Sequence, residues 1–381
     1  MNTRQYNAIV VGLGAMGSAT LYHLALRGWR VLGVEQFGPG HTKGSSHGDS
    51  RIIRETYFEH PLYVPLVRRA HTLWRELEAR SGKSLMTITG GLMIGPADGV
   101  VVHGTLRSAL EHNLPHEILA PDEVRKRFPA FAPAENLVTV LDPRAGFLNP
   151  DACNEAHVTL ARNAGAETRF NEPLLDWDAD GDGVLVTTSS GVYTADHLVL
   201  AAGPWTGQLL PDLVLPLTIE RQVVFWLDPK RDQANYDVGR MPIYAYEYRK
   251  GDICYGFPRL ERGVKASVMH GGETALNPEE VDRTVREAEE KPLRAALRPI
   301  LPALSKAPVR ESEVCLFTNT PDHDFIVDFH PFFPQVLISS PCSGHGFKFA
   351  SAIGEIQADL LTKGETSFDL PPFRIDRWVE R

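Results

Sequence analysis

The chain has 381 residues, 43% of them hydrophobic and 23% charged, which is the composition of an ordinary globular protein long enough for two domains. Its 39 basic and 48 acidic residues give a net charge of −9, which argues against binding to nucleic acid or to an anionic membrane. No apolar stretch approaches the ~18 residues of a transmembrane helix.

The N-terminus and the cysteines narrow the class of protein further. The chain begins almost directly with an apolar strand pattern, which leaves no room for a signal peptide and favours a cytoplasmic location. The cysteines are Cys153, Cys254, Cys315 and Cys342. Their spacing fits neither a metal site nor a disulfide scaffold, so we expect no bound metal, and a buried, inert thiol is the default for each.

The N-terminal segment predicts a dinucleotide-binding unit. An apolar run over 7–12 is followed by Gly12-Leu13-Gly14-Ala15-Met16-Gly17, a helical pattern over 18–27 and a second apolar run over 29–34. The glycines let the backbone approach a pyrophosphate, and N–H groups at the start of the helix can bind it. Glu35 ends the second run and can accept hydrogen bonds from a ribose, which favours FAD or NAD over NADP. The motif alone does not decide between FAD and NAD.

A long polar loop follows this unit. It is rich in Gly, Ser and His over 37–49 and ends in Ser50-Arg51-Ile52-Ile53-Arg54. A loop of this length is uncommon in a compact domain without a functional reason. If the arginine segment is helical, Arg51 and Arg54 lie on one face near the helix start.

Helical and strand patterns then alternate up to residue 216. Helices are predicted over 65–80, in two segments within 103–128 and over 151–163, with a strand over 88–95 and a turn over 146–150. Short strands follow over 166–170, 183–188 and 192–195. A buried strand that ends at Ala201-Ala202-Gly203-Pro204-Trp205 would return the chain to the nucleotide domain and complete its cofactor cradle.

The last part of the chain is first β-rich and then glycine-rich. Segments dense in aromatic and aliphatic residues between 216 and 318 are typical of the sheet of a substrate domain, and 278–298 predicts a charged helix. A strand over 334–340, a glycine-rich loop over 343–348 and a helix over 349–362 would belong to the nucleotide domain again.

Several stretches distributed over the whole chain resemble a single family. They are Gly12–Gly17, His41-Thr42, Gly48–Arg54, Arg221-Gln222-Val223, Tyr255-Gly256-Phe257-Pro258, Lys265, Cys315, Asp324–Asp328 and Ser343-Gly344-His345-Gly346-Phe347-Lys348-Phe349. Together they resemble monomeric sarcosine oxidase and the related N-methyl amino acid oxidases, which are flavin enzymes. The resemblance implies FAD as the cofactor.

The resemblance also implies a mixed α/β (α+β) fold of the two-domain type found in glutathione reductase and D-amino-acid oxidase. A Rossmann-like FAD-binding domain would be discontinuous and comprise residues 1–87, 146–216 and 320–381. A second, β-sheet-rich substrate domain would comprise residues 88–145 and 217–319.

The resemblance implies a thioether between Cys315 and the 8α-position of the flavin. His47 and Arg51 would lie against the flavin ring, where positive charge favours the reduced, anionic flavin, and Lys265 would activate dioxygen. The cofactor-binding residues implied in this way are Gly12, Gly14, Met16, Gly17, Glu35, Ser50, Arg51, Ala202, Gly203, Trp205, Cys315, Gly344, Gly346, Phe347 and Lys348.

The implied substrate pocket departs from the family pattern. Arg54 and Lys348 would hold the substrate carboxylate, as an arginine fork and a second cation can. Where the family has a histidine four residues after the lysine, this chain has Met269, followed by His270, and Phe317 replaces a tyrosine. The residues assigned to the pocket are Arg54, Tyr246, Tyr255, Met269, His270, His345 and Lys348, with Tyr246 in the place of a methionine.

The function implied is oxidation of a secondary amine amino acid such as sarcosine by a monomeric enzyme. A hydride passes to FAD, the imine is hydrolysed, and dioxygen reoxidises the flavin to give hydrogen peroxide. An N-carboxymethyl or bulkier N-substituted substrate such as iminodiacetate is an alternative, because Tyr246 and Arg259 could accommodate it. An NAD-dependent dehydrogenase and a flavin-binding protein without turnover are further alternatives.

Overall fold

The computed structural model describes residues 5–378, and the mixed α/β class is confirmed. The α-helices are α1 (Ala15–Leu26), α2 (Tyr63–Ser81), α3 (Val100–Glu111), α4 (Pro121–Arg127), α5 (Pro150–Asn163), α6 (Glu290–Leu297) and α7 (Ala350–Lys363). No helix within the described range combines the length and the apolar composition needed to cross a membrane.

The strands form three sheets. The first sheet contains β1 (Tyr6–Val11), β2 (Val31–Glu35), β9 (Glu167–Phe170), β10 (Leu174–Asp180), β11 (Gly183–Thr188), β12 (Val192–Leu200), β19 (Ile326–Phe329) and β20 (Val336–Ser340). The second sheet contains β5 (Gly91–Gly95), β6 (Glu117–Leu119), β7 (Val138–Asp142), β13 (Thr218–Leu227), β14 (Ile243–Arg249), β15 (Asp252–Leu260), β16 (Gly263–Val268), β17 (Thr274–Ala275) and β18 (Val309–Asn319). The small third sheet contains β3 (Arg51–Ile53), β4 (Met86–Ile88) and β8 (Gly146–Leu148).

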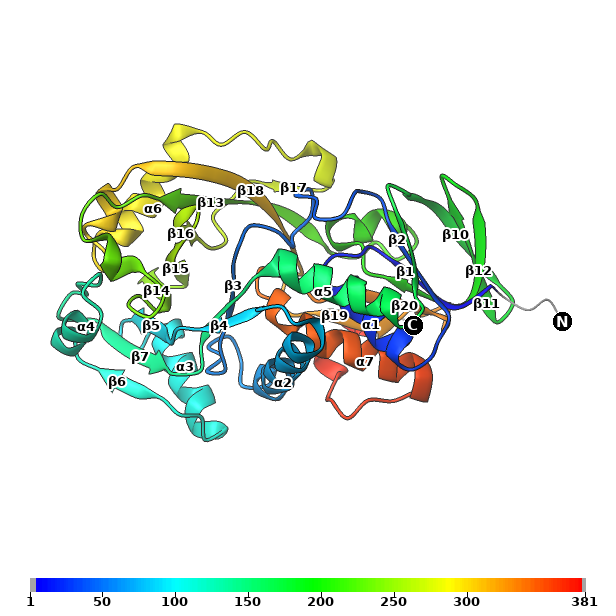
Figure 1. Cartoon of the computed structure of the whole chain (residues 1–381), viewed down its shortest axis with the longest axis horizontal. Coiled ribbons are helices and arrows are strands. Elements are labelled where there is room, and N and C mark those ends of the chain that lie inside the picture. Colours follow the sequence, from blue (N-terminus) through cyan, green and yellow to red (C-terminus); the bar gives the residue numbers. More distant parts are fainter. Residues whose placement is uncertain (1–4, 379–381) are drawn as a thin grey trace.

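The first sheet has a parallel centre in the order β20-β12-β1-β2-β9. Side chains alternate along β1, so that Ala8 and Val10 join the core formed with α1, α5 and α7, while Ile9 and Val11 pack with Val184 on the other face. Helix α1 is buried nearly all round and packs against both α5 and α7 (Figure 1). Hydrophobic residues on every side of α1 therefore place it at the centre of this lobe.

The turn between β1 and α1 is held by close backbone contacts. Gly12 has a φ of +88°, and a Cβ at this position would lie 2.5 Å from the carbonyl oxygen of Ala201. A Cβ on Gly17 would lie 1.8 Å from the carbonyl oxygen of Gly12. The Leu13 N–H donates a hydrogen bond to Glu35 Oε2 (2.8 Å), which ties the end of β2 to the turn. Both glycines are therefore needed to bring α1 against the sheet.

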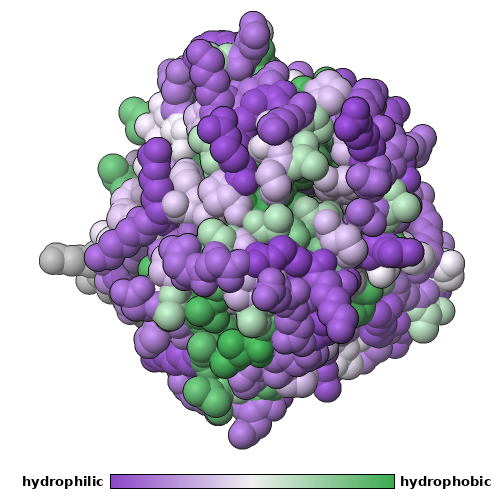
Figure 2. Space-filling model, turned by 90° about the vertical axis from the view of Figure 1, so that its left-hand side faces the viewer, coloured by the Kyte–Doolittle hydropathy of each residue, from purple (hydrophilic) through white to green (hydrophobic). Residues whose placement is uncertain are grey.

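The second sheet forms the other lobe, on the left of Figure 1, in the order β17-β13-β16-β15-β14-β5-β7-β6. Strand β18 pairs antiparallel with β13 along nearly its whole length. Side chains of α4 and α6 pack on one face of this sheet, and those of α3 pack on the other face. The surface at this end of the molecule is mostly hydrophilic, as Figure 2 shows.

Two local predictions are wrong. Residues 278–298 form an α-helix only at α6, with short 3-10 turns over Pro278–Glu280 and Glu287–Glu289. Between these turns the carbonyl oxygens of Asp282 and Thr284 accept hydrogen bonds from the buried Arg221 side chain. Strand β8 occupies most of the predicted turn over 146–150, because it pairs with β3. Since residues 51–53 form β3, the condition of a helical arginine segment is not met. Tertiary hydrogen bonds override the local pattern in each case.

We predict that Gly17→Ala lowers the free energy of unfolding of the FAD-free protein by about 1–3 kcal/mol, because the added methyl group collides with the backbone at Gly12. Urea unfolding measures this difference. Gly207→Ala is the control, because a Cβ there meets no atom within 4 Å. Equal stability of the Gly17→Ala variant and the wild type would contradict the packing argument.

Candidate active site

A cavity of about 920 Å³ lies between the first and second sheets. Its wall combines the β1–α1 turn, the loop over 36–50, the inward faces of β13 to β16 and β18, and the loop over 341–348. A single cavity therefore connects the N-terminal glycine motif with the glycine-rich loop near the C-terminus, which are more than three hundred residues apart in the sequence.

One end of the cavity has the features of a dinucleotide site. Gly12, Gly14 and Met16 line it together with Glu35, and the start of α1 opens into it. The Ala15 N–H donates to Ser46 Oγ (3.1 Å), so the polar loop lies against the beginning of the helix. Free N–H groups at a helix start, next to glycines without side chains, suit a pyrophosphate. Ala202, Gly203 and Trp205 also line the cavity.

At the other end, Cys315 lies in the cavity wall next to Arg51. The Arg51 Nη2 atom donates to the carbonyl oxygen of Ser45 (2.9 Å) and lies 3.2 Å from Cys315 Sγ. Burial alone would raise the pKa of the Cys315 thiol, but Arg51 and His47 outweigh burial and lower it below its ordinary value. Cys315 is thus the one cysteine of the chain whose pKa is lowered.

Lys265 reaches into the same region from β16. Its ammonium donates to the carbonyl oxygens of Gly48 (2.5 Å) and Ser50 (2.9 Å), and only 2% of the residue is exposed. Burial, and next the charge of Arg51, hold the pKa of Lys265 well below its ordinary value. The lysine is therefore fixed by neutral acceptors next to a second cation.

Arg54 and Lys348 form a second pair of cations, and both are buried. The guanidinium of Arg54 stacks 3.9 Å from the ring of Phe58 and donates to the Glu59 carboxylate. The Lys348 ammonium donates to the carbonyl oxygen of His345 (2.6 Å), and burial followed by the charge of Arg54 lowers its pKa to about 7. In this structure the guanidinium of Arg54 is therefore already paired with the carboxylate of Glu59.

A buried tyrosine and histidine support Lys348. Tyr57 OH lies 2.5 Å from His345 Nδ1 and 3.5 Å from Lys348 Nζ, and His345 Nε2 lies 3.0 Å from the carbonyl oxygen of His323. Burial lowers the pKa of His345 to about 4, so this ring is neutral near pH 7. A neutral His345 that donates a hydrogen bond through Nε2 accepts one at Nδ1 from the Tyr57 hydroxyl.

The comparisons with known proteins identify the family. The sequence pattern described as FAD dependent oxidoreductase matches residues 7–360. The chain is an FAD-dependent oxidoreductase. It is 42% identical to "Monomeric sarcosine oxidase" of Streptomyces avermitilis, over 97% of this chain and 96% of that protein. It is 34% identical to "N-methyl-L-tryptophan oxidase" of Salmonella typhimurium, over 99% of this chain and the whole of that protein.

Solved structures of other proteins have the same fold. The structure of NikD, described as an unusual amino acid oxidase essential for nikkomycin biosynthesis, has a TM-score of 0.84 at 26% identity and covers 98% of each chain. Glycine oxidase from Geobacillus kaustophilus has a TM-score of 0.80 at 21% identity, over 99% of this chain and all of that one. The two-lobe architecture with a Rossmann-like FAD-binding part is therefore confirmed.

The residues of this FAD-dependent oxidoreductase that the sequence assigns to its site lie mostly in one cavity. Besides those described above, the cavity wall contains Ser50, Tyr255, Met269, His345, Gly344, Gly346 and Phe347. Gly17 does not line the cavity. It lies behind the turn, where it packs against the backbone of Gly12. His47 lies behind the wall beside Cys315, with 3% of the residue exposed.

Tyr246 and His270 do not line the cavity, contrary to the prediction. On β14, Ala245 faces the cavity opposite Tyr255, and Tyr246 therefore points to the other face of the sheet, into the core that packs against α6. His270 follows β16 with a φ of +55°, and its Nδ1 lies 2.9 Å from Glu220 Oε2. The backbone turn thus directs the ring toward Glu220.

The wall near Arg54 is apolar. Cavity-lining residues of this region that also belong to one hydrophobic cluster or pack against it are Ile52, Phe58, Ala245, Ile253, Tyr255, Phe257 and Met269. Arg259, whose Nε donates to Asp237 Oδ1 (2.8 Å), lies outside this wall. The space next to the cation pair therefore suits an apolar group better than a second carboxylate.

The sequence interpretation missed Glu59 and Glu313. Side chains two residues apart on a strand share one face, so the position of Glu313 two residues before Cys315 on β18 could have indicated that both lie on the same side. No comparable signal marks Glu59, because it reaches Arg54 through an irregular loop.

We predict that the holoenzyme binds a simple carboxylate such as acetate more weakly as pH rises above about 7. Only the protonated form of Lys348 attracts the anion, and its pKa in the structure is about 7, so Kd should rise about tenfold per pH unit until Arg54 alone holds the anion. The FAD absorbance spectrum between pH 6 and 9 reports binding. Lys348→Met should bind weakly at pH 6 with a flat pH profile; a variant that keeps the wild-type pH dependence would refute this assignment.

Proposed function

We propose that the chain is an oxidase of N-methyl or other secondary amine amino acids and that it carries FAD bound covalently through Cys315. Residues 1–87, 146–216 and 320–381 would form the FAD-binding domain, and residues 88–145 and 217–319 the substrate domain. The observation that carries the proposal is the buried cation pair Arg54 and Lys348 in the same cavity as Cys315 and Lys265. The names of the relatives, which refer to sarcosine and N-methyl-L-tryptophan, support this substrate class.

The proposed binding of the substrate begins with an exchange of carboxylates. The substrate carboxylate would replace Glu59 on Arg54 and pair with the ammonium of Lys348. This anchor would direct the amine and its N-substituent along the apolar wall with Ala245 and Met269. Fixing the substrate in one orientation is the main contribution of these residues to the rate.

Positive charge in the cavity would favour the reactive form of the amine. Arg51 and Lys265 lie where they raise the electrostatic potential, and a nearby cation lowers the pKa of an amine. FAD, when bound, supplies the acceptor for the two electrons of the C–H bond next to nitrogen. Lys265, held by two carbonyl oxygens, would then stabilise the negative charge that forms when dioxygen is reduced.

The alternatives have less support. The case for iminodiacetate rested on Tyr246 and Arg259, and neither lines the cavity. The family assignment to FAD removes the case for an NAD-dependent dehydrogenase. A flavin-binding protein without turnover would have no use for buried cations with lowered pKa values. Monomeric state and cytoplasmic location stay predictions.

The proposed activity is tested by peroxide release from a panel of secondary amine acids. We expect turnover of N-methyl amino acids, with kcat/KM for a substrate with an apolar side chain or N-substituent above that for iminodiacetate. A protein whose FAD is bleached by none of these acids under anaerobic conditions is not an oxidase of this class.

We predict that acid precipitation of the holoenzyme leaves the yellow colour in the pellet. A thioether at Cys315 survives denaturation, whereas FAD held without a covalent bond is released into the supernatant. Cys315→Ser should release all its flavin, and Cys342→Ser, which changes another cavity-lining cysteine, should release none. A colourless wild-type pellet contradicts the covalent link.

We predict that Lys265→Met slows reoxidation by dioxygen by about a hundredfold or more, since it removes a fixed cation from the place where negative charge develops. Reduction by substrate should change much less. Stopped-flow absorbance of the flavin separates the two half-reactions. An equal effect on both would show that Lys265 acts on substrate binding or on the whole fold.

A further inference from the structure

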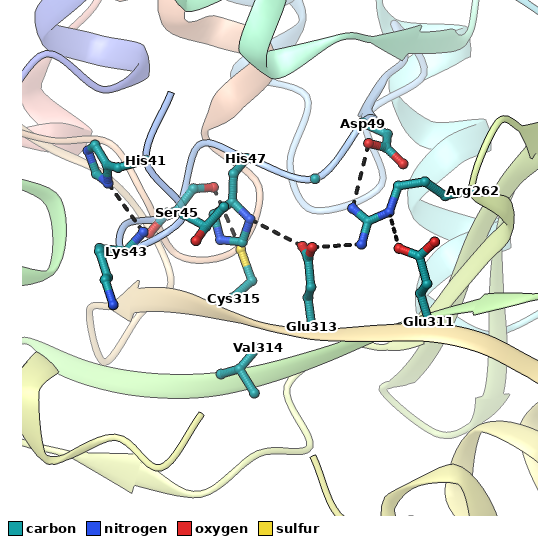
Figure 3. A network of polar contacts seen from close by, with 12 residues as sticks. His41, Lys43, Ser45, His47, Asp49, Arg262, Glu311, Glu313, Val314 and Cys315 are labelled. Carbon is teal, nitrogen blue, oxygen red and sulfur yellow. Dashed lines mark hydrogen bonds and ion pairs between the residues drawn. The ribbon is translucent and has the colours of Figure 1, made fainter. Parts of the chain in front are cut away.

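A chain of charged side chains leads from the surface to Cys315. Glu311, Glu313 and Cys315 alternate along β18 and share one face of the strand, as Figure 3 shows. Arg262, from the turn between β15 and β16, donates to Glu311 Oε2 (2.7 Å) through Nε and to Glu313 Oε1 (2.6 Å) through Nη2. Its guanidinium also lies 3.6 Å from the Trp226 ring and 3.7 Å from Asp49 Oδ1. Arg262 is therefore fixed on several sides.

The next residue in this row of charged side chains is His47. Its Nδ1 lies 3.5 Å from Glu313 Oε2, and the ring lies beside Cys315 (Figure 3). Neither nitrogen of this buried ring, nor Glu313 Oε2, has a hydrogen-bond partner of good geometry. A buried polar ring without such a partner is expensive unless its charge is compensated. Glu313 on one side and the sulfur on the other supply this compensation.

We propose that Glu313, fixed by Arg262, is a positioning residue that keeps His47 protonated and oriented beside Cys315, so that the sulfur is held as a thiolate for attachment to FAD. The inference rests on the proposed covalent link, but it concerns the state of the thiol before FAD is attached. The mechanism of oxidation described above does not use Glu313 or Arg262.

The charges around the sulfur and the imidazole support this role. The charges of Arg51, His47 and Lys265 act on Cys315. Cys315 also interacts with the charge of Arg283 and has Tyr255 as a neutral neighbour. Burial opposes the charge of His47, but Cys315 and Glu313 outweigh burial and raise the pKa of His47 above its ordinary value. Arg51 acts in the opposite direction on His47, and the Asp151 carboxyl also lies within its field. Glu313 is thus the fixed anion that favours the imidazolium.

The attachment itself needs an ionised sulfur. In balance, the thiol and a methyl C–H of the flavin ring become one S–C bond, and the two electrons and two protons released pass to the flavin ring. Dioxygen then takes them up and becomes hydrogen peroxide. The thiolate is the nucleophile, so the rate of bond formation depends on the fraction of Cys315 that is ionised. A protonated His47 raises this fraction at neutral pH.

The full chain prepared without FAD provides the test. Iodoacetamide alkylates Cys315 at a rate that rises where the thiol ionises and changes again where His47 loses its proton, and mass spectrometry distinguishes Cys315 from the other cysteines. In Glu313→Gln the transition at higher pH, where His47 loses its proton, should move to lower pH by at least one unit. This is a tenfold change in the protonation equilibrium of His47. Removal of an anion lowers the pKa of a histidine, so the opposite shift would overturn the proposal.

Two matched variants separate positioning from structural damage. Glu311→Gln removes the other carboxylate that pairs with Arg262. Glu311 does not contact His47, so the pH profile of alkylation should stay unchanged. Glu313→Asp keeps the charge and should restore most of the wild-type profile. The same shift in Glu311→Gln as in Glu313→Gln would show a general effect of Arg262 and overturn the specific role of Glu313.

Addition of FAD to the same FAD-free proteins gives an independent readout. Acid-stable flavin should appear at least about fivefold more slowly in Glu313→Gln than in the wild type near neutral pH, as expected if less thiolate is present. Wild-type rates of both alkylation and attachment in Glu313→Gln would overturn the proposal. If the wild type forms no acid-stable flavin although Glu313→Gln shifts the alkylation profile, the covalent link fails and the role of Glu313 stands.

Discussion

Positive charge kept away from water is the constraint on which the cavity depends. Lys265 and Lys348 donate to backbone carbonyl oxygens, and Arg51 does the same along the loop over 45–50. Burying a cation without acceptors costs several kcal/mol. The carbonyl oxygens of the loop over 45–50 therefore have to point toward Lys265 and Arg51, which fixes the course of this loop. Because carbonyl oxygens carry no net charge, they satisfy the donors without cancelling the field. The same contacts therefore build the wall and fix the cations within it.

Strand alternation decides which residues meet this field. On β14, β16 and β18 the residues Ala245, Lys265 and Cys315 face the cavity, while their direct neighbours join hydrophobic cores. Both sides of the second sheet are packed, so a one-residue slip of β16 would move the Lys265 ammonium from the cavity into the core that contains Val264 and Ala266. The catalytic face is thus protected by the same pattern that stabilises the sheet.

The sequence alone predicts the parts of the fold that depend on local pattern. Helices α1, α2, α5 and α7 and the turn at Gly12 are confirmed, because their period, caps and glycines are encoded within a few residues. The segment 278–298 fails because Arg221, far away in the sequence, takes its carbonyl oxygens. The choice of Tyr246 fails for a related reason: alignment counts residues, whereas the facing of β14 is set by its pairing with β15. Glu59 meets Arg54 through an irregular loop that no motif reveals, whereas alternation along the strand could have placed Glu313 on the same face as Cys315.

The Glu59 carboxylate gives the cavity a built-in counter-ion. While it holds Arg54, the guanidinium is neither exposed nor uncompensated, and the empty site does not have to bear an isolated charge. In the proposed binding mode an incoming acid would exchange one carboxylate for another on Arg54. The affinity for the acid would then depend on how much more strongly its carboxylate binds Arg54 than the Glu59 carboxylate does. All such acids carry a carboxylate, so its contribution would cancel when their affinities are compared. In the proposed binding mode, discrimination would depend on the part of the ligand that lies against Phe58, Ala245 and Met269.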